Sequence, residues 1–550
     1  MTPSRISVYN LATKITMKRS QLLNLFSLRN RHALIFAIAI VCVPVIAQTV
    51  ANSASRVSTT SEQRAESAFN SARNNPLELR AFLVRMPKGA DLHMHLTGAV
   101  YAESWIHDGA ADNLCVNLAQ LAFTVPDSMS AATPPTPNCH DGSVPIAQAF
   151  TDQHLYDAIV DALSMRTFVP ATGESAHDHF FATFSKFHLV EKSHIGDWLD
   201  EVSARAAAQN EQSLEIMDTP DFSHTADIAR KIGWQTDFAA FRNQLLAQGL
   251  QSDIDAAQKE FDGAESSRRK LENCGQPNES IACKVQTRFL FQALRGYPKE
   301  QVFAQLLVAF ETASADPNIV GVNFVMPEDG FISMRDYNIH MQIFNFMHSM
   351  YPNVHVSLHA GEIAPGVVPY EGLCCHVRGA VEQGHAERIG HGVDVMFETN
   401  PQDLLKEMAT KHVMVEINLT SNDVILGVAG ANHPFPLYRK FGVPVALSSD
   451  DEGVSRIDLT HEFVRAVQTY NLSYPDLKKL VRTSVEHSFL PGPSLWRAPD
   501  DFRATVSPCS RERLGSAHPA DACANFLHSS ARATQQWELE RRFAAFESSI

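Results

Sequence analysis

The chain has 550 residues, of which 45% are hydrophobic and 19% are charged, as in folded globular proteins and unlike disordered or fibrous chains. Acidic residues outnumber basic residues by 61 to 46, which gives a net charge of −15. This balance argues against a nucleic-acid partner, because phosphate backbones are bound mainly through Lys and Arg. The length is compatible with several average domains or with one α/β barrel that carries additional segments.

The first 47 residues have the features of a secretory signal peptide. They contain six basic residues and no acidic residue, and they end in the apolar run Ala33–Ala47. This run is shorter than the roughly 20 residues that span a bilayer. We therefore expect a periplasmic or secreted protein with no stable membrane partner after cleavage. The alternative is an uncleaved N-terminal membrane anchor. Residues 48–85 are expected to form a linker and a helical segment.

Eight of the nine cysteines follow this leader, and an even number in an exported chain favours disulfides. We expect the bonds Cys115–Cys139 and Cys509–Cys523, whereas Cys274 and Cys283 are a third pair that is close in sequence. The adjacent Cys374 and Cys375 are compatible with a vicinal disulfide or with free thiols. Residues 107–150 are rich in Pro, Ala, Asn and Ser, which predicts an inserted surface segment held by the first disulfide.

From residue 86 to residue 495, strand-like runs alternate with longer helical patterns. The eight runs are Ala90–Leu96, Ser213–Met217, Val285–Ala293, Ile319–Val325, Val354–Leu358, Arg388–His391, Val413–Asn418 and Val443–Ser448. The helical patterns include Lys299–Thr312, Met334–Met350, Gly372–Gln383 and Pro401–Thr410. Strands in βα order form a parallel sheet, and eight such units predict a (β/α)8 TIM barrel of the α/β class. Residues 496–550 are expected to be a C-terminal extension that ends in a helix.

Candidate metal ligands fall at the ends of three predicted strands, where barrels of this type carry their active sites. His93 and His95 are two residues apart on the first strand, so that both imidazoles can face the same side. His359 ends the fifth strand and Asp450 ends the eighth. Three histidines and one carboxylate suit zinc with a position left open for water. A single histidine of this kind is weak evidence, and the prediction depends on their joint placement.

Four segments in this order carry a resemblance to a known family: MPKGADLHMHLTGA, HAGE, ERIGHG and SSDDEGVSR. Together they resemble the adenosine deaminase family of the amidohydrolase superfamily. The leader and the insertion are similar to its exported, growth-factor-related branch. The resemblance implies one Zn²⁺ per chain, held by His93, His95, His359 and Asp450. It also implies that Glu362, His391 and Asp451 are catalytic, and that His95, Thr97, Met326 and Asp451 contact the substrate.

The reaction implied by the resemblance is the hydrolytic deamination of adenosine, and of 2′-deoxyadenosine, to inosine and ammonia by a zinc-activated water. His391 and Asp451 would orient that water and take its proton while it attacks the purine. Glu362 would donate a proton to the ring nitrogen N1. The expected partner is a small-molecule purine nucleoside, and a homodimer is compatible with the sequence.

Two departures from the family pattern concern residues that contact the substrate and not the metal ligands. Thr97 replaces the acidic residue of the family's HLDG, and Met326 replaces the second glycine of G-x-D-L-x-G-x-E. The alternatives are a deaminase of another 6-aminopurine, a different mononuclear amidohydrolase, and a non-catalytic nucleoside-binding protein. Binuclear amidohydrolases usually have a carboxylated lysine on the fourth strand that bridges the two metal ions. Residues 319–331 contain no lysine, which disfavours a binuclear centre. Phe180, Phe181, Phe184 and Phe187 are expected either in a lid or in a core stripe.

Overall fold

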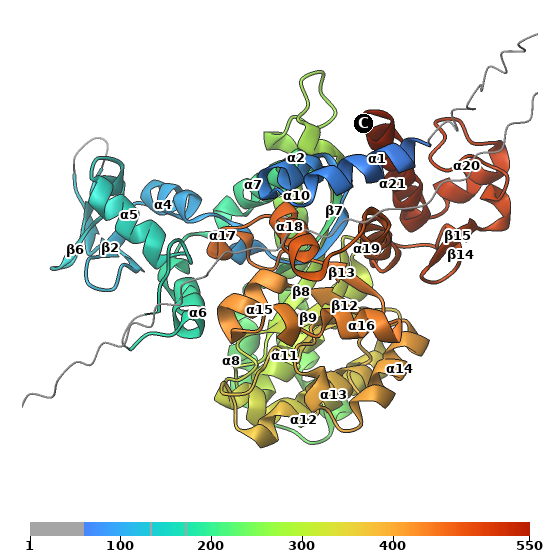
Figure 1. Cartoon of the computed structure of the whole chain (residues 1–550). Helices are drawn as coiled ribbons and strands as arrows, with labels where there is room; N and C mark the ends of the chain where they lie inside the picture. The colour runs from blue at the N-terminus through green and yellow to red at the C-terminus, as the bar shows by residue number, and fades with distance from the viewer. Residues whose placement is uncertain (1–59, 132–134, 171–172) are drawn as a thin grey trace, which may run out of the picture. The chain divides into compact units, whose positions relative to one another are not determined.

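A computed structural model describes residues 60–131, 135–170 and 173–550, so the predicted leader lies outside the described residues. Eight parallel strands pair in chain order and form the centre of the molecule (Figure 1). They are β1 (Gly89–His95), β7 (Glu211–Asp218), β8 (Gln286–Leu294), β9 (Ile319–Val325), β10 (His355–Ala360), β11 (Arg388–His391), β12 (Met414–Ile417) and β13 (Val445–Leu447). Each expected strand is present within two residues of its predicted bounds.

The first strand also pairs with the residues that follow the eighth, which makes the sheet a barrel. The His95 amide donates to the Asp450 carbonyl at 3.1 Å, and the Asp450 amide donates to the His93 carbonyl at 2.9 Å. Every residue of β1 and β7 is buried, as expected for strands covered on both faces. The predicted (β/α)8 barrel is therefore confirmed.

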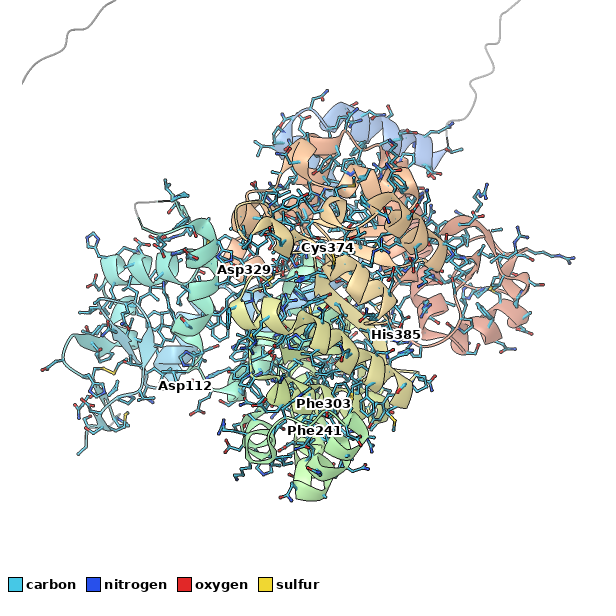
Figure 2. The ribbon with its side chains drawn as sticks, turned by 90° about the horizontal axis from the view of Figure 1, so that it is seen from below. Asp112, Phe241, Phe303, Asp329, Cys374 and His385 are labelled. Carbon is cyan, nitrogen blue, oxygen red and sulfur yellow. A yellow bond between two sulfur atoms is a disulfide. The ribbon has the colours of Figure 1, made fainter. Side chains whose placement is uncertain are left out.

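Helices pack on the outside of these strands. Contacts with the sheet are made by α7 (Ile195–Ala208), α11 (Lys299–Ala315), α13 (His376–Glu382), α18 (Leu459–Tyr470) and α19 (Tyr474–Glu486). Helices α12 (Phe331–Met350) and α14 (Pro401–Lys411) match their predictions at one end and extend them by three residues and one residue at the other. Phe241 of α9 (Phe238–Leu245) stacks on Phe303 of α11, with the ring centroids 4.6 Å apart (Figure 2).

One predicted helix is wrong as a single element. The run from Gly372 to Gln383 is split into η5 (Tyr370–Leu373) and α13, and Cys375 between them has a positive φ of 86°. A left-handed residue cannot continue a right-handed helix, so the chain turns at this point. The vicinal disulfide Cys374–Cys375 lies in the turn, and Figure 2 labels Cys374 there.

The ends of the described chain are helical. α1 (Ser61–Ala72) begins at Thr60, which forms a capping box with Gln63, and α2 (Pro76–Arg85) has proline at its first position. The C-terminal helices are α20 (Asp521–His528) and α21 (Ala531–Ser548), and α21 packs on α1 and α19. In the part of the chain that is described, no helix combines the length and apolar character that a membrane span requires.

The segment after β1 begins with α3 (Leu96–Ala99) and α4 (Ala102–Ala111), and then forms small sheets. β2 (Cys115–Asn117) pairs with β3 (Phe123–Thr124) and β6 (Ser143–Pro145), while β4 (Ser128–Met129) pairs with β5 (Pro137–Asn138). The predicted disulfides Cys115–Cys139 and Cys509–Cys523 are present, as is Cys274–Cys283. The first residues of the expected insertion, 107–111, belong instead to α4.

Candidate functional site

The four predicted metal ligands meet at the carboxyl ends of the strands. His93, His95, His359 and Asp450 are buried, and each offers one ligand atom within 4.8 Å of all the others. Nε2 of His95 lies 3.1 Å from Nε2 of His359 and 3.3 Å from Oδ1 of Asp450. Nε2 of His93 is buried without a hydrogen-bond partner. A buried nitrogen without a partner is costly, and a cation between these atoms would satisfy it. The donor set therefore fits a zinc ion.

A second set of side chains fixes the orientation of the three imidazoles. The Nδ1 atom of His93 lies 2.6 Å from Glu416, that of His95 lies 2.6 Å from Gln292, and that of His359 lies 2.8 Å from Asn323. Each partner atom is an oxygen that accepts, so Nδ1 carries the proton and Nε2 is free to bind a metal. Sequence reasoning missed Gln292 and Glu416. Glu416 is the one polar residue of β12, whereas Gln292 is one of several polar residues of β8 and had no distinct signal.

Glu362, His391 and Asp451 line a cavity of about 500 Å³, which three of the four candidate ligands, His95, His359 and Asp450, also line. Burial raises the pKa of the Glu362 carboxyl well above its usual value, and the charge of Asp450 raises it further. Glu362 can therefore keep a proton at neutral pH. Its Oε1 lies 3.6 Å from Nε2 of His391, so that the two groups face each other.

The tautomer of His391 is set by its neighbours. Asn422 donates from Nδ2 to Nδ1 of His391 at 2.8 Å, while the Oδ1 of Asn422 faces Nε2 of His433 at 2.9 Å. Burial lowers the pKa of His391 to about 3, so the ring is neutral and carries its proton on Nε2. His391 thus presents a donor to the cavity. Its φ of 70° and the φ of 63° at Asp450 are left-handed, a strain that clusters at functional sites.

Asp451 has its place because residue 98 is glycine. A Cβ at Gly98 would lie 1.5 Å from Oδ1 of Asp451, closer than any non-bonded contact allows. Oδ1 of Asp451 is buried without a hydrogen-bond partner, although it lies in the wall of the cavity. Asp451 is therefore an acceptor that a bound molecule can use.

The predicted substrate contacts also lie in this wall. Thr97 and Met326 line the cavity, together with Phe180, Phe181 and Phe184 from α6 (Ala176–Phe187). Phe187 does not: its ring stacks on Trp105 with centroids 4.4 Å apart. The aromatic stripe is thus divided between the cavity and the core.

Met326 stands in a conformation that favours glycine, with a φ of 94°. We expect Met326→Gly to lower the KM for adenosine by roughly tenfold, since one methylene of steric fit is worth about 1–3 kcal/mol in a pocket. Met326→Ala keeps the Cβ and should improve KM less. Steady-state kinetics of both variants tests this, and an unchanged or higher KM in Met326→Gly would mean that Met326 does not crowd the purine.

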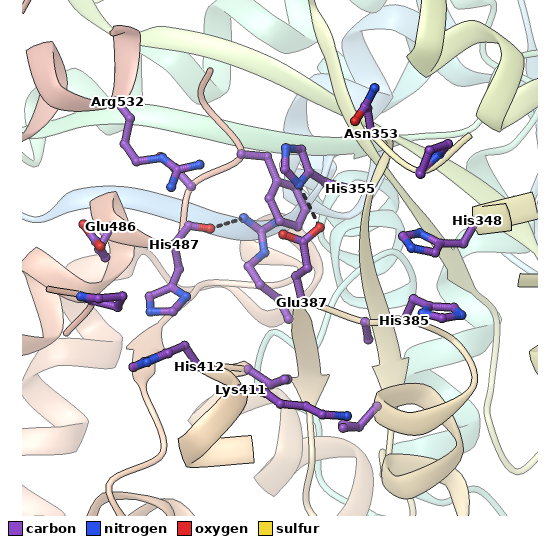
Figure 3. Close-up of a pocket in the computed structure, with 18 residues that line it drawn as sticks. His348, Asn353, His355, His385, Glu387, Lys411, His412, Glu486, His487 and Arg532 are labelled. Carbon is purple, nitrogen blue, oxygen red and sulfur yellow. Dashed lines mark hydrogen bonds and ion pairs between the residues drawn. The ribbon is translucent and has the colours of Figure 1, made fainter. Parts of the chain in front are cut away.

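A second, more polar cavity lies at the opposite ends of the strands (Figure 3). Its volume is about 770 Å³, and its lining includes His355, Glu387, His412, His487 and Arg532. His355 and Glu387 pair at 2.7 Å across it. It contains none of the predicted site residues, and no cluster of metal-ligand geometry is found there among the described residues. The candidate site is therefore the cavity at the carboxyl ends.

A family model described as adenosine deaminase matches residues 248–497. This stretch contains His359, Glu362, His391, Asp450 and Asp451. Over this stretch the chain is similar to the adenosine deaminase family. The family match does not reach the H-x-H pair at residues 93 and 95, which the structure brings to the other ligands.

Similar proteins were found both by sequence and by structure. The chain is 38% identical over 135 residues to an adenosine deaminase of Clostridium perfringens, which is 24% of this chain and 37% of that protein. The match thus spans about a third of the relative. An N6-mAMP deaminase from Arabidopsis is 18% identical in sequence, with a TM-score of 0.49 over 75% of this chain and 96% of that one. An adenine deaminase from Arthrobacter aurescens is 17% identical, with a TM-score of 0.46 over 74% and 94%.

Proposed function

We propose that the protein is a zinc-dependent deaminase that converts adenosine and 2′-deoxyadenosine to inosine or 2′-deoxyinosine and ammonia. One observation carries the proposal. The four buried ligand atoms lie within 4.8 Å of one another, and His95, His359 and Asp450 among them line the same cavity as Glu362, His391 and Asp451. Hydrolysis of the C–N bond at an amidine carbon requires a metal, a proton donor and a proton acceptor beside one another.

His93, His95, His359 and Asp450 would hold the zinc ion. When bound, zinc supplies a hydroxide at neutral pH by lowering the pKa of a water from 15.7 to about 7. We expect elemental analysis of the gently purified protein to find about one zinc per chain. Two metal ions per chain, or none, would contradict a mononuclear site.

The remaining chemistry belongs to the protein side chains. Glu362, protonated because it is buried, donates to N1 of the purine as C6 becomes tetrahedral. His391 donates a hydrogen bond from Nε2 toward the attacking oxygen. Because that nitrogen already carries a proton, the base is Asp451, whose Oδ1 is free.

The lining of the cavity favours a neutral nucleoside over a nucleotide. Among the described residues that line it, none is Lys or Arg. The hollow beside it, which shares Ile425, is lined by Asp178, Asp329 and Asp423 and also by His177, which pairs with Asp178 and Asp329. A 5′-phosphate is normally bound by cationic side chains or helix N-termini, and the cavity lining offers neither Lys nor Arg for it.

An absorbance assay with a panel of 6-aminopurines tests the proposal. The panel contains adenosine, 2′-deoxyadenosine, adenine, AMP and N6-methyl-AMP. We expect turnover of the two nucleosides, with kcat/KM for AMP lower by about 100-fold because no cation offsets the phosphate charge. Preferred turnover of adenine or AMP would replace the proposed substrate, and no ammonia from any compound would contradict the activity.

We also propose that the protein is exported, on the basis of the leader and of the disulfides. Four disulfide bonds are compatible with an oxidising compartment. Residues 107–150 and 496–550 would then be surface additions to a barrel spanning residues 86–495.

A further inference from the structure

Glu328, in the turn after β9, is a buried carboxylate to which the proposed reaction assigns no role. Only 1% of the residue is exposed. Its two oxygens accept the amides of two successive residues: Oε1 accepts from Gly361 at 3.0 Å, and Oε2 accepts from Glu362 at 2.8 Å. The carboxylate thus holds the backbone of the residue that donates the proton.

Glu328 is itself fixed from the other side. Nδ1 of His376 lies 2.5 Å from Oε1, and Nη2 of Arg295 lies 3.9 Å from Oε2. The His376 ring stacks on Tyr337, with centroids 3.7 Å apart and planes within 7°. Burial alone would raise the pKa of Glu328, but Arg295 and His376 lower it to about 2. Glu328 therefore stays charged at neutral pH.

The path of the chain explains why this support is needed. Gly361 has a φ of 78°, so the chain turns sharply after β10 and points the Glu362 side chain into the cavity. The last pairs of the strand ladder join His359 and Ala360 to β11, and beyond them the Gly361 carbonyl accepts the Val393 amide at 2.8 Å. The amides of Gly361 and Glu362 are instead held by Glu328.

We propose that Glu328 is a positioning residue, which fixes the proton-donating Glu362 by binding its backbone. The proposal rests on the proposed function, because it needs Glu362 to be the donor. A carboxylate is required since it only accepts, and it faces three N–H donors. The glutamine side chain has only one accepting oxygen, and its NH₂ group would face one of the N–H donors without an acceptor. A displacement of about 1 Å in a reacting group can cost about 100-fold in rate.

The test is Glu328→Gln, measured on zinc-loaded protein. We expect kcat to fall by about 10- to 100-fold, with KM changed less than about threefold and zinc retained. Glu328→Asp keeps the charge but is one methylene shorter, so its kcat should lie between those of wild type and Glu328→Gln. It replaces Glu328→Gln in the test if the glutamine variant does not fold. When Glu362 is already replaced by Gln, adding Glu328→Gln should lower kcat by less than about a further threefold, because the carboxyl group that Glu328 positions is gone.

Glu272→Gln is the matched control. Glu272 is equally buried and pairs with Arg268 at 2.8 Å, but it does not line the cavity. It should keep wild-type kcat. A kcat for Glu328→Gln within about threefold of wild type, an equal loss in Glu272→Gln, or additive losses in the double variant would overturn the proposal.

Amide hydrogen exchange separates this proposal from the proposed function. Glu328→Gln should speed exchange in the peptide that contains Gly361 and Glu362, and Glu272→Gln should not. This readout needs no substrate, so it decides the backbone role even if wild-type protein turns over none of the purines. Unchanged exchange in Glu328→Gln would show that Glu328 does not hold this turn.

Discussion

Glu362→Gln should lose most of its turnover while it keeps its zinc. Glutamine has nearly the same size and can still form a hydrogen bond to N1, but it cannot deliver a proton. A positioned acid or base is typically worth about 10²–10⁴-fold in rate, and we expect a fall of that size in kcat. The metal should remain because Glu362 is outside the set of four ligands.

The division between kcat and KM identifies the cause. The contact with N1 in the ground state survives in Glu362→Gln, so KM should change little, as expected when an interaction is lost only in the transition state. The measurement is steady-state kinetics together with the zinc content of the same sample. Retention of more than about a tenth of the wild-type kcat with zinc bound would exclude Glu362 as the acid.

His359→Ala should lose both zinc and activity. Nε2 of His359 lies 3.1 Å from Nε2 of His95, and Asn323 holds its other nitrogen, so Nε2 is the atom that the ring offers to the cluster. Loss of an outer partner of a metal ligand already costs about 10- to 100-fold in metal affinity, and loss of the ligand itself should cost more. The zinc content, measured by elemental analysis after dialysis, and the activity should both fall in His359→Ala.

His340→Ala is the control for this variant. His340 is fully buried in α12, packs against Phe324, and is not part of the cluster. Its loss creates a cavity of similar size and should lower stability without removing zinc. Full zinc content in His359→Ala, or an equal zinc loss in His340→Ala, would contradict the assignment of His359 as a ligand.

The sequence by itself predicted the barrel strands and brought forward the four candidate metal ligands. The strands were predicted because buried parallel strands are short apolar runs at regular intervals, which are local features. His93 and His95 were predicted to face one side because strand residues alternate with a period of two. His359 and Asp450 were predicted at the same end because parallel strands end at the same edge.

Only the tertiary structure decided which side chains form hydrogen bonds to the imidazoles of the site. Glu416 is 323 residues from His93, and Asn422 is 31 residues from His391. The resemblance to the family implied that His391 and Asp451 both take the proton, whereas the contact with Asn422 makes His391 a donor.

Glu328 and the aromatic residues of α6 show the same limit. The hydrogen bonds from Gly361 and Glu362 to Glu328 cross from one strand end to the next, and Phe187 faces Trp105 while its neighbours face the cavity. A local pattern places residues on an element and on one of its faces. Contacts between elements depend on how those elements pack and where their turns bend, and this is set by the whole core.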